Sequence, residues 1–84
     1  MSPERLLARL GRGELQNVRF GDFVRLLDAL GFEHRRTRGS HRVYVHPEVG
    51  EILVVQPTSG GGAKPYQIRQ LLRAVEQYAL RVKE

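Results

Sequence analysis

The apolar residues of segment 20–30 recur at intervals of three and four positions, which is the spacing of one face of an amphipathic helix. Gly31 follows at the position where a left-handed C-cap is expected, and Phe32 can fold back onto the last turn. We therefore predict a helix over residues 20–30. Its apolar face comprises Phe20, Phe23, Val24, Leu27 and Leu30.

A second amphipathic helix is predicted from Pro65 to about Ala79. Arg69 and Arg73 lie four residues apart on a face other than the apolar one, which predicts a solvated basic side. The apolar positions of this helix are Ile68, Leu71, Leu72 and Val75.

The N-terminal segment predicts a shorter helix. Ser2 is a candidate N-cap, Pro3 stands at the first helical position, and Gly11 ends or weakens the helix. We expect residues 1–16 to form a peripheral helix that packs on this domain or on a neighbouring chain. Its apolar stripe is made of Leu6, Leu7 and Leu10.

Between the two longer helices the pattern changes to that of strands. Residues 41–46 have strong β-formers at their centre, residues 47–50 form a turn, and residues 51–56 are an almost fully apolar strand. Because a two-stranded sheet is rarely stable alone, the polar segment 33–38 is expected as a third, edge strand whose charges discourage unwanted pairing.

The order of elements defines the expected fold class. It is α+β, with an α-β-β-β-α order after the short N-terminal helix, and two helices cover one face of a three-stranded antiparallel sheet. A chain of 84 residues has room for one domain. We expect a single domain over residues 1–84, with the peripheral helix in 1–16 and the core in 17–84.

Alternation along the middle strand places His41 on the same face as Val43 and Val45, which we expect to be the core side. Residues 57–65 contain three consecutive glycines and are expected to form a flexible loop. No Gly-Lys-Ser/Thr sequence follows these glycines, so the loop is not a nucleotide-binding P-loop.

The composition of the chain indicates a class of partner. Lys and Arg number 14 against 9 Asp and Glu, the net charge is +5, and 12 of the 14 cations are Arg. Because Arg makes bidentate bonds to phosphate and stacks on flat rings, this bias favours nucleic acid.

The absence of cysteine excludes disulfides, a zinc knuckle and a thiolate nucleophile. No apolar run approaches the roughly 20 residues of a membrane span, and we expect a cytoplasmic protein.

The candidates for acid–base chemistry near neutral pH are three histidines, of which His41 has the most suggestive surroundings. Gly39 and Ser40 precede it, and Gly39 leaves room for a ligand to approach the backbone. Arg38 and Arg42 flank it and could hold a phosphate and oppose the charge of a phosphorane-like transition state. Metal-free RNA cleavage needs these parts alone, since the ribose 2′-hydroxyl is a built-in nucleophile. On the core side, however, His41 could act only at a frayed strand start or beside a bulge at residues 39–40.

The other two histidines are expected to be structural or solvated. His34 lies on the predicted edge strand. His46 precedes Pro47, and we expect it to be the residue that ends its strand. No histidine is paired with carboxylates at ligand spacing, so we expect no metal site and no cofactor.

A basic cluster surrounds the Gly-Ser-His segment. It comprises Arg35, Arg36, Arg38 and Arg42, with Lys64 nearby. We expect Arg36, Arg38, Arg42 and Lys64 to bind RNA phosphates, each of which would steepen the salt dependence of binding. The alternatives are a merely solvated edge strand, or a strand and loop that offer backbone groups to a protein partner.

The whole pattern resembles the HicA family of toxin–antitoxin mRNA interferases. The helix that ends in Gly31-Phe32, the segment 38–41 with Gly-Ser-His, and the stretch 43–47 with His-Pro occur in the order and spacing of that family. The resemblance continues through the last strand into the final helix and spans roughly residues 20 to 75. This chain departs from the compact form of the family by about 16 extra N-terminal residues and by a Gly-rich loop with one Lys.

The resemblance implies a fold like that of double-stranded-RNA-binding domains. It also implies cleavage of mRNA with an essential histidine that maps onto His41, as general base or general acid, and a HicB-type antitoxin that covers this histidine.

Two other functions are alternatives to the endoribonuclease hypothesis. One is a non-catalytic RNA-binding module, although a duplex-RNA binder normally has a Lys-rich start to its last helix and residues 64–67 contain a single Lys. The other is a protein-binding adaptor whose interface would be Leu6, Leu7 and Leu10.

Overall fold

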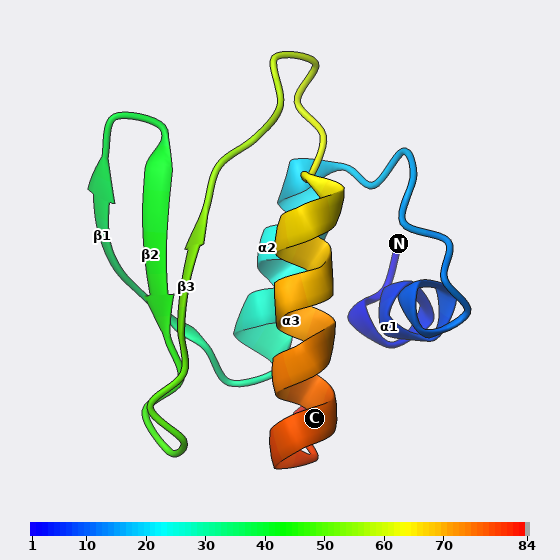
Figure 1. Ribbon diagram of the computed structural model, residues 1–84, viewed down its shortest axis with the longest axis vertical. Helices are drawn as coiled ribbons and strands as arrows, with labels where there is room; N and C mark the ends of the chain where they lie inside the picture. The colour runs from blue at the N-terminus through cyan, green and yellow to red at the C-terminus, as the bar shows by residue number, and fades with distance from the viewer. Residues whose placement is uncertain (84) are drawn as a thin grey trace.

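The computed structural model describes residues 1–83 and has the predicted order of elements (Figure 1). The N-terminal helix is followed by a helix, three strands and a last helix, so the α+β, α-β-β-β-α fold class is confirmed. The elements are α1 (Pro3–Gly11), α2 (Phe20–Ala29), β1 (Glu33–Arg38), β2 (His41–Val45), β3 (Ile52–Val55) and α3 (Pro65–Tyr78).

The helix ends follow the capping residues that the sequence offers. The Ser2 side chain accepts a hydrogen bond from the Arg5 N–H at 3.2 Å, and Pro3 opens α1. After α2, Gly31 has a φ of +100°, and the Phe32 N–H donates to the Leu27 carbonyl at 3.0 Å. This is a Schellman motif, so the predicted C-cap is confirmed.

The three strands form one antiparallel sheet in the order β1-β2-β3. Strand β2 is central, and β1 and β3 are the two edges. The register between β1 and β2 shifts between His34 and Arg36, which indicates a β-bulge in β1. The bulge therefore lies in the middle of the edge strand, whereas the Gly39-Ser40 turn joins the two strands without one.

Figure 1 shows the sheet on one side of the molecule, α2 and α3 beside it, and α1 on the side of these helices away from the sheet. Helix α1 packs on α2 and α3 within the chain, and both Leu6 and Leu10 are 1% exposed. Burial of these leucines contradicts the adaptor hypothesis, because two of the three residues of its interface are already used inside the core.

The expected core side of β2 is wrong. Tyr44 of β2 and Leu53 and Val55 of β3 are buried beneath the helices, whereas Val43 and Val45 are only partly buried. His41 does share a face with those two valines, but that face is the open one. Both faces of β2 carry apolar side chains, so the alternation alone does not decide which face the helices cover. They cover the face with Tyr44, which joins Leu53 and Val55 in the core.

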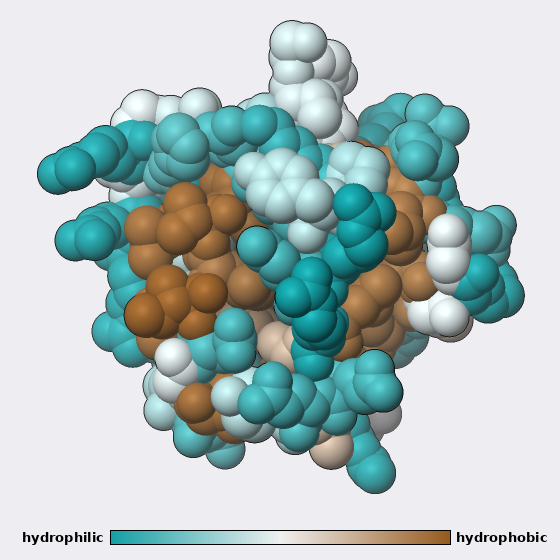
Figure 2. Space-filling model, in the orientation of Figure 1, coloured by the Kyte–Doolittle hydropathy of each residue, from teal (hydrophilic) through white to brown (hydrophobic). Residues whose placement is uncertain are grey.

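The open face of the sheet carries an aliphatic patch over β2 and β3. The exposed apolar residues of this patch are Ile52 and Val54 of β3, at 59% and 44%, and Val43 and Val45 lie beside them in the β2–β3 register. Figure 2 shows apolar surface over the strands, bordered by hydrophilic side chains.

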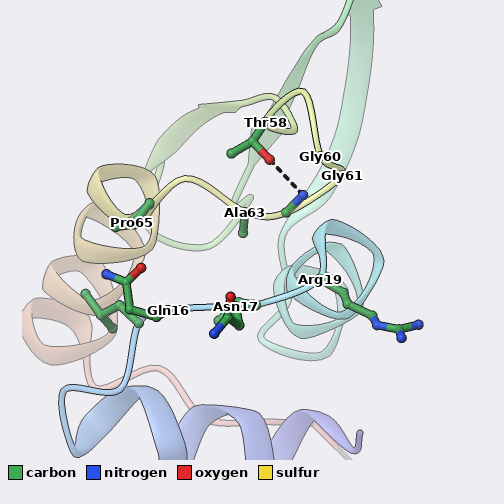
Figure 3. A pocket seen from close by; sticks show the side chains of 11 residues that line it. Gln16, Asn17, Arg19, Thr58, Gly60, Gly61, Ala63 and Pro65 are labelled. Atoms are coloured by element: carbon green, nitrogen blue, oxygen red, sulfur yellow. Dashed lines mark hydrogen bonds between the residues drawn. The ribbon is translucent and has the colours of Figure 1, made fainter.

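The Gly-rich segment is held by hydrogen bonds rather than being an open flexible loop. The Gly62 N–H donates to the Thr58 hydroxyl at 2.9 Å, a bond drawn in Figure 3. The Ala63 N–H donates to the Val18 carbonyl at 2.7 Å, and the Phe20 N–H donates to the Gly61 carbonyl at 3.0 Å. The first bond closes the loop on itself, and the last two join it to Val18 and to the first residue of α2. The expectation of a flexible loop was wrong because these two partners lie far away in the sequence.

Among residues 1–83, no helix combines the length and the apolar character that crossing a membrane requires.

Candidate functional site

The Gly-Ser-His segment forms the tip of the β1–β2 hairpin. Gly39 and Ser40 are the two-residue connection, and Gly39 has a φ of +60° whereas Ser40 does not have a positive φ. Glycine at the first central position with positive φ is typical of a type II′ hairpin turn. A Cβ at Gly39 would meet nothing within 4 Å, so the space beside this turn is open.

His41 is the first residue of β2 and is exposed. Within residues 1–83, neither of its ring nitrogens makes a hydrogen bond and its ring stacks on no aromatic neighbour. The predicted need for a bulge at residues 39–40 disappears, because the face of His41 is not the core side. The imidazole is therefore accessible to a ligand and free to accept or donate a proton.

The predicted basic cluster is divided between the two faces of the sheet. Arg38 is the direct cross-strand partner of His41, and Arg36 is the partner of Val43, so both side chains belong to the open face with His41. Arg42 belongs to the opposite face, where its guanidinium lies 5.3 Å from the centre of the Phe20 ring. Lys64 is on the helical side too, as the N-cap residue of α3.

Arg35 is not part of the group that faces His41. It lies at the bulge, and its guanidinium forms an ion pair with Glu33 at 3.2 Å. Both side chains are more than half exposed, so this pair adds little to stability.

A polar chain connects the Gly-Ser-His turn with the start of α3. The Ser40 hydroxyl makes a long contact, 3.4 Å, with the Gln56 side-chain oxygen, and the Gln56 N–H donates to the Gln67 side-chain oxygen at 3.2 Å. Gln67 in turn donates to the Tyr66 hydroxyl at 3.1 Å. Since Gln67 is only 3% exposed, this chain fixes the end of β3 to α3 beside the turn.

Gln67 is not among the site residues predicted from the sequence. The feature of the sequence that could have indicated its role is its position in the helical period, because Gln67, Leu71 and Ala74 lie on the same, buried face of α3. A polar side chain among apolar ones on a core face normally has a fixed hydrogen-bond partner, and here that partner is the backbone next to the candidate site.

His46 is a core residue rather than a simple strand terminator. It is 2% exposed, its Nδ1 accepts from the Glu48 N–H at 3.3 Å, and its Nε2 lies 3.1 Å from the Leu30 carbonyl. Because Nδ1 acts as acceptor, the proton of the neutral ring belongs on Nε2, which donates to Leu30. The ring edge also packs against Phe32, with 5.2 Å between ring centres. Both nitrogens are occupied, so His46 is unsuited to proton transfer with a ligand.

His46 also explains the Gly-Phe sequence at the end of α2. A Cβ at Gly31 would lie 2.8 Å from the His46 Nε2, closer than any side chain tolerates without displacement. The two motifs that surround Gly-Ser-His, Gly31-Phe32 and His46-Pro47, thus meet in the core and make one structural contact.

His34 is exposed as expected, but its ring is engaged. It stacks on Tyr44 with 5.1 Å between ring centres, and its Nε2 lies 2.8 Å from the Thr37 hydroxyl across the bulge. Of the three histidines, His41 is the one whose ring remains uncommitted within residues 1–83.

The structure is thus a small basic α-β-β-β-α domain with an exposed imidazole opposite an arginine. The family model described as the HicA toxin of bacterial toxin-antitoxin matches residues 20–76, which is more than half of the chain. The chain belongs to this family and is the toxin component of a toxin–antitoxin system. Membership implies an antitoxin partner. No curated protein and no solved structure matches the chain.

The matched region begins at the first residue of α2 and ends within α3. It contains His41 and the whole sheet, whereas α1 and the segment that joins it to α2 lie outside it.

Proposed function

We propose that this toxin is a metal-independent endoribonuclease that cleaves mRNA, with His41 as its catalytic residue. The observation that carries the proposal is the exposed His41 ring, which has no hydrogen-bond partner within residues 1–83 and lies directly across the hairpin from Arg38. An accessible imidazole beside a guanidinium is suited to proton transfer at a phosphodiester.

The reaction that these groups suit is internal transesterification of RNA. The ribose 2′-hydroxyl loses its proton as its oxygen attacks the adjacent phosphorus, and the bond from phosphorus to the 5′-oxygen breaks as that oxygen gains a proton. His41 serves either as the base at the 2′-hydroxyl or as the acid at the 5′-oxygen. Arg38 opposes the negative charge that builds up on the phosphoryl oxygens.

The two groups of cations suggest how the RNA backbone is held. Arg36 and Arg38 accompany His41 on the open face, and Arg42 and Lys64 lie on the helical side of the sheet. A strand of RNA that passes over the tip of the β1–β2 hairpin would meet both groups. Each phosphate so neutralised makes binding more sensitive to salt.

A HicB-type antitoxin is proposed to inhibit the toxin by covering His41. Family membership supports the existence of an antitoxin, and the exposed position of the imidazole on the open face leaves it accessible to a protein as well as to RNA.

The test is cleavage of a single-stranded RNA by the purified protein in EDTA. We expect the wild type to cut and His41→Ala to lose at least about 100-fold in rate, because general acid–base catalysis contributes roughly 10²–10⁴-fold. His34→Ala is the matched control, since it removes an exposed ring from the opposite face, and it should cut at nearly the wild-type rate.

Equal rates for the wild type and His41→Ala would refute the catalytic assignment. Salt-resistant binding of duplex RNA by the wild type without any cleavage would instead favour a non-catalytic RNA-binding module.

A further inference from the structure

The outer edge of β3 is a row of backbone groups without a neighbouring strand. Strand β3 pairs with β2 on one side, and no other strand of residues 1–83 lies beyond it. The Glu51 carbonyl points toward β2, where it accepts from the His46 N–H at 2.9 Å. The Gln56 N–H points away from β2, toward Gln67. Because the direction alternates along a strand, Ile52 and Val54 present both their N–H and their C=O groups at the free edge.

This edge lacks the protection that sheet edges usually have. Natural edges are blunted by charge, by proline or by a covering element, and β1 at the other edge consists of polar and charged residues that are all exposed. Strand β3 has neither a charge nor a proline, and its residues at the free edge are the exposed Ile52 and Val54. An exposed apolar edge of this kind is a template for pairing with another strand.

A groove runs between this edge and α3. Its volume is about 290 Å³, near the lower end of the roughly 300–1,000 Å³ of small-molecule sites, and it suits side chains from a strand better than an enclosed ligand. The α3 residues in it recur at intervals of three and four, so they lie on one stripe of the helix. The polar side chains of the groove are Glu51, Gln70, Arg73 and Gln77.

We propose that the free edge of β3 binds an extended segment of an acidic protein partner as a fourth strand of the sheet. Main-chain hydrogen bonds to Ile52 and Val54 give such a segment its affinity, and its alternating side chains give specificity. Aliphatic side chains on one face of the segment continue the open-face surface of Ile52 and Val54. Carboxylate or amide side chains on its other face lie against α3, where Arg73 forms no ion pair within residues 1–83.

Charge and size favour this partner over a second copy of the chain. Each copy carries a net charge of +5, so two copies repel each other, whereas an acidic partner is attracted. The strand is also only four residues long, and pairing two such strands buries far less than the ~1,200 Å² or more of a stable interface. A larger acidic protein can add further contacts around the same strand.

The proposal goes beyond the nuclease activity and does not require it. Binding is measured on the full chain without RNA, so a failure of strand addition and a failure of catalysis at His41 are separate results.

The probe is a capped nine-residue peptide of alternating valine and glutamate, added to the ¹⁵N-labelled protein. We expect the amide protons of Ile52 and Val54 to exchange at least about tenfold more slowly when the peptide saturates the protein, because they become hydrogen-bonded to it. The control peptide has the same side chains but carries N-methyl groups at the alternate residues that would pair, and it should give no protection.

Val54→Pro tests the same edge by a change in the protein instead of in the peptide. The Val54 N–H faces away from β2, so proline removes no hydrogen bond of the sheet but blocks the fourth strand. We expect at least tenfold weaker peptide binding, with the spectrum of the remaining residues unchanged. If this variant does not fold, Val54→Glu supplies a charge that repels the acidic peptide at a 44% exposed position, and the same loss is expected.

Three results would overturn the proposal. The first is equal protection by the N-methylated peptide, the second is protection of β1 amides in place of Ile52 and Val54, and the third is undiminished binding by a folded variant at position 54. A concentration-dependent dimer in which Ile52 and Val54 are already protected without peptide would assign the edge to a second copy instead.

Discussion

His41 and His46 lie five positions apart along the chain, yet one ring is exposed and the other is buried in the core. An odd spacing on a strand sends the two side chains to opposite faces, so His41 faces solvent and His46 enters the core. The buried ring has both nitrogens in hydrogen bonds, and the exposed ring has neither within residues 1–83. Accessibility and free lone pairs therefore distinguish His41 as the candidate for catalysis.

The same contrast predicts a large loss of stability for the His46 variant and almost none for the His41 variant. His46→Ala removes the partner of the Leu30 carbonyl and of the Glu48 N–H and leaves a cavity beside Phe32. We expect it to lower the free energy of unfolding by about 2–4 kcal/mol, since a buried polar group left unpaired and a cavity each destabilise. Urea unfolding followed by circular dichroism measures the change.

His41→Ala is the matched control for this measurement. It removes an exposed imidazole without a hydrogen-bond partner in residues 1–83, and its unfolding free energy should stay within about 0.5 kcal/mol of the wild type. Similar losses in the two variants would contradict the assignment of His46 to the core and His41 to the surface.

At the scale of the elements, β1 and β2 make a hairpin whose two faces carry different chemistry. The register places Arg36 and Arg38 with His41, and places Thr37 with Arg42. Arg36 and Arg38 share that face because they are two residues apart in the strand and their pairing is regular from the turn onward. The bulge between His34 and Arg36 offsets the alternation beyond Arg36 by one residue, so His34 lies opposite Tyr44 on the other face.

This division predicts that the arginines of β1 are not equivalent in RNA cleavage. Arg38→Ala should lower kcat/KM at least about tenfold, because it removes a guanidinium from the face of the proposed catalytic residue. Arg35→Ala removes the same charge at the bulge, where Arg35 pairs with Glu33, and should change kcat/KM less than about threefold. Initial rates on one RNA at constant ionic strength compare the two variants.

Arg38→Lys separates charge from geometry in this comparison. A lysine keeps the charge but not the planar pair of donors, so partial recovery is expected. Equal losses in the Ala variants at positions 35 and 38 would mean that the hairpin contributes only its overall charge.

The elements were predictable from local patterns, but the assignment of faces was not. Helix α2 was evident from its periodicity and from Gly31, and all three strands lie within one residue of the predicted bounds. Which face of β2 is covered depends on how α2 and α3 pack over Tyr44, and the sequence shows only that both faces carry apolar residues. The chain of contacts through Gln67 likewise joins residues that are eleven or more positions apart in the sequence.

At the scale of the whole molecule, α1 belongs to the core although it lies outside the matched region of the family. Leu6 and Leu10 are buried on α2 and α3, and the following segment bonds through Val18 to the loop that leads into α3. The pocket of Figure 3 lies between this segment and the loop, with Gln16 and Asn17 on one side and Thr58 on the other, while the Arg19 side chain points away from it. The N-terminal segment therefore supports the start of α3.

This arrangement predicts that a substitution in α1 destabilises the whole domain. Leu10→Ala should lower the free energy of unfolding by about 2–5 kcal/mol, as expected for a buried leucine that leaves a cavity. Leu7→Ala, at a half-buried position of the same helix, makes the same change in helix propensity and should cost clearly less. If α1 is part of one cooperative core, backbone circular dichroism and the fluorescence of the buried Tyr44 should report the same loss at the same urea concentration. Because the chain has three tyrosines, the fluorescence is measured in a Tyr66→Phe, Tyr78→Phe background. Unfolding of α1 alone at low denaturant, with the Tyr44 signal unchanged, would show instead that α1 is an appendage on an independently stable α-β-β-β-α unit.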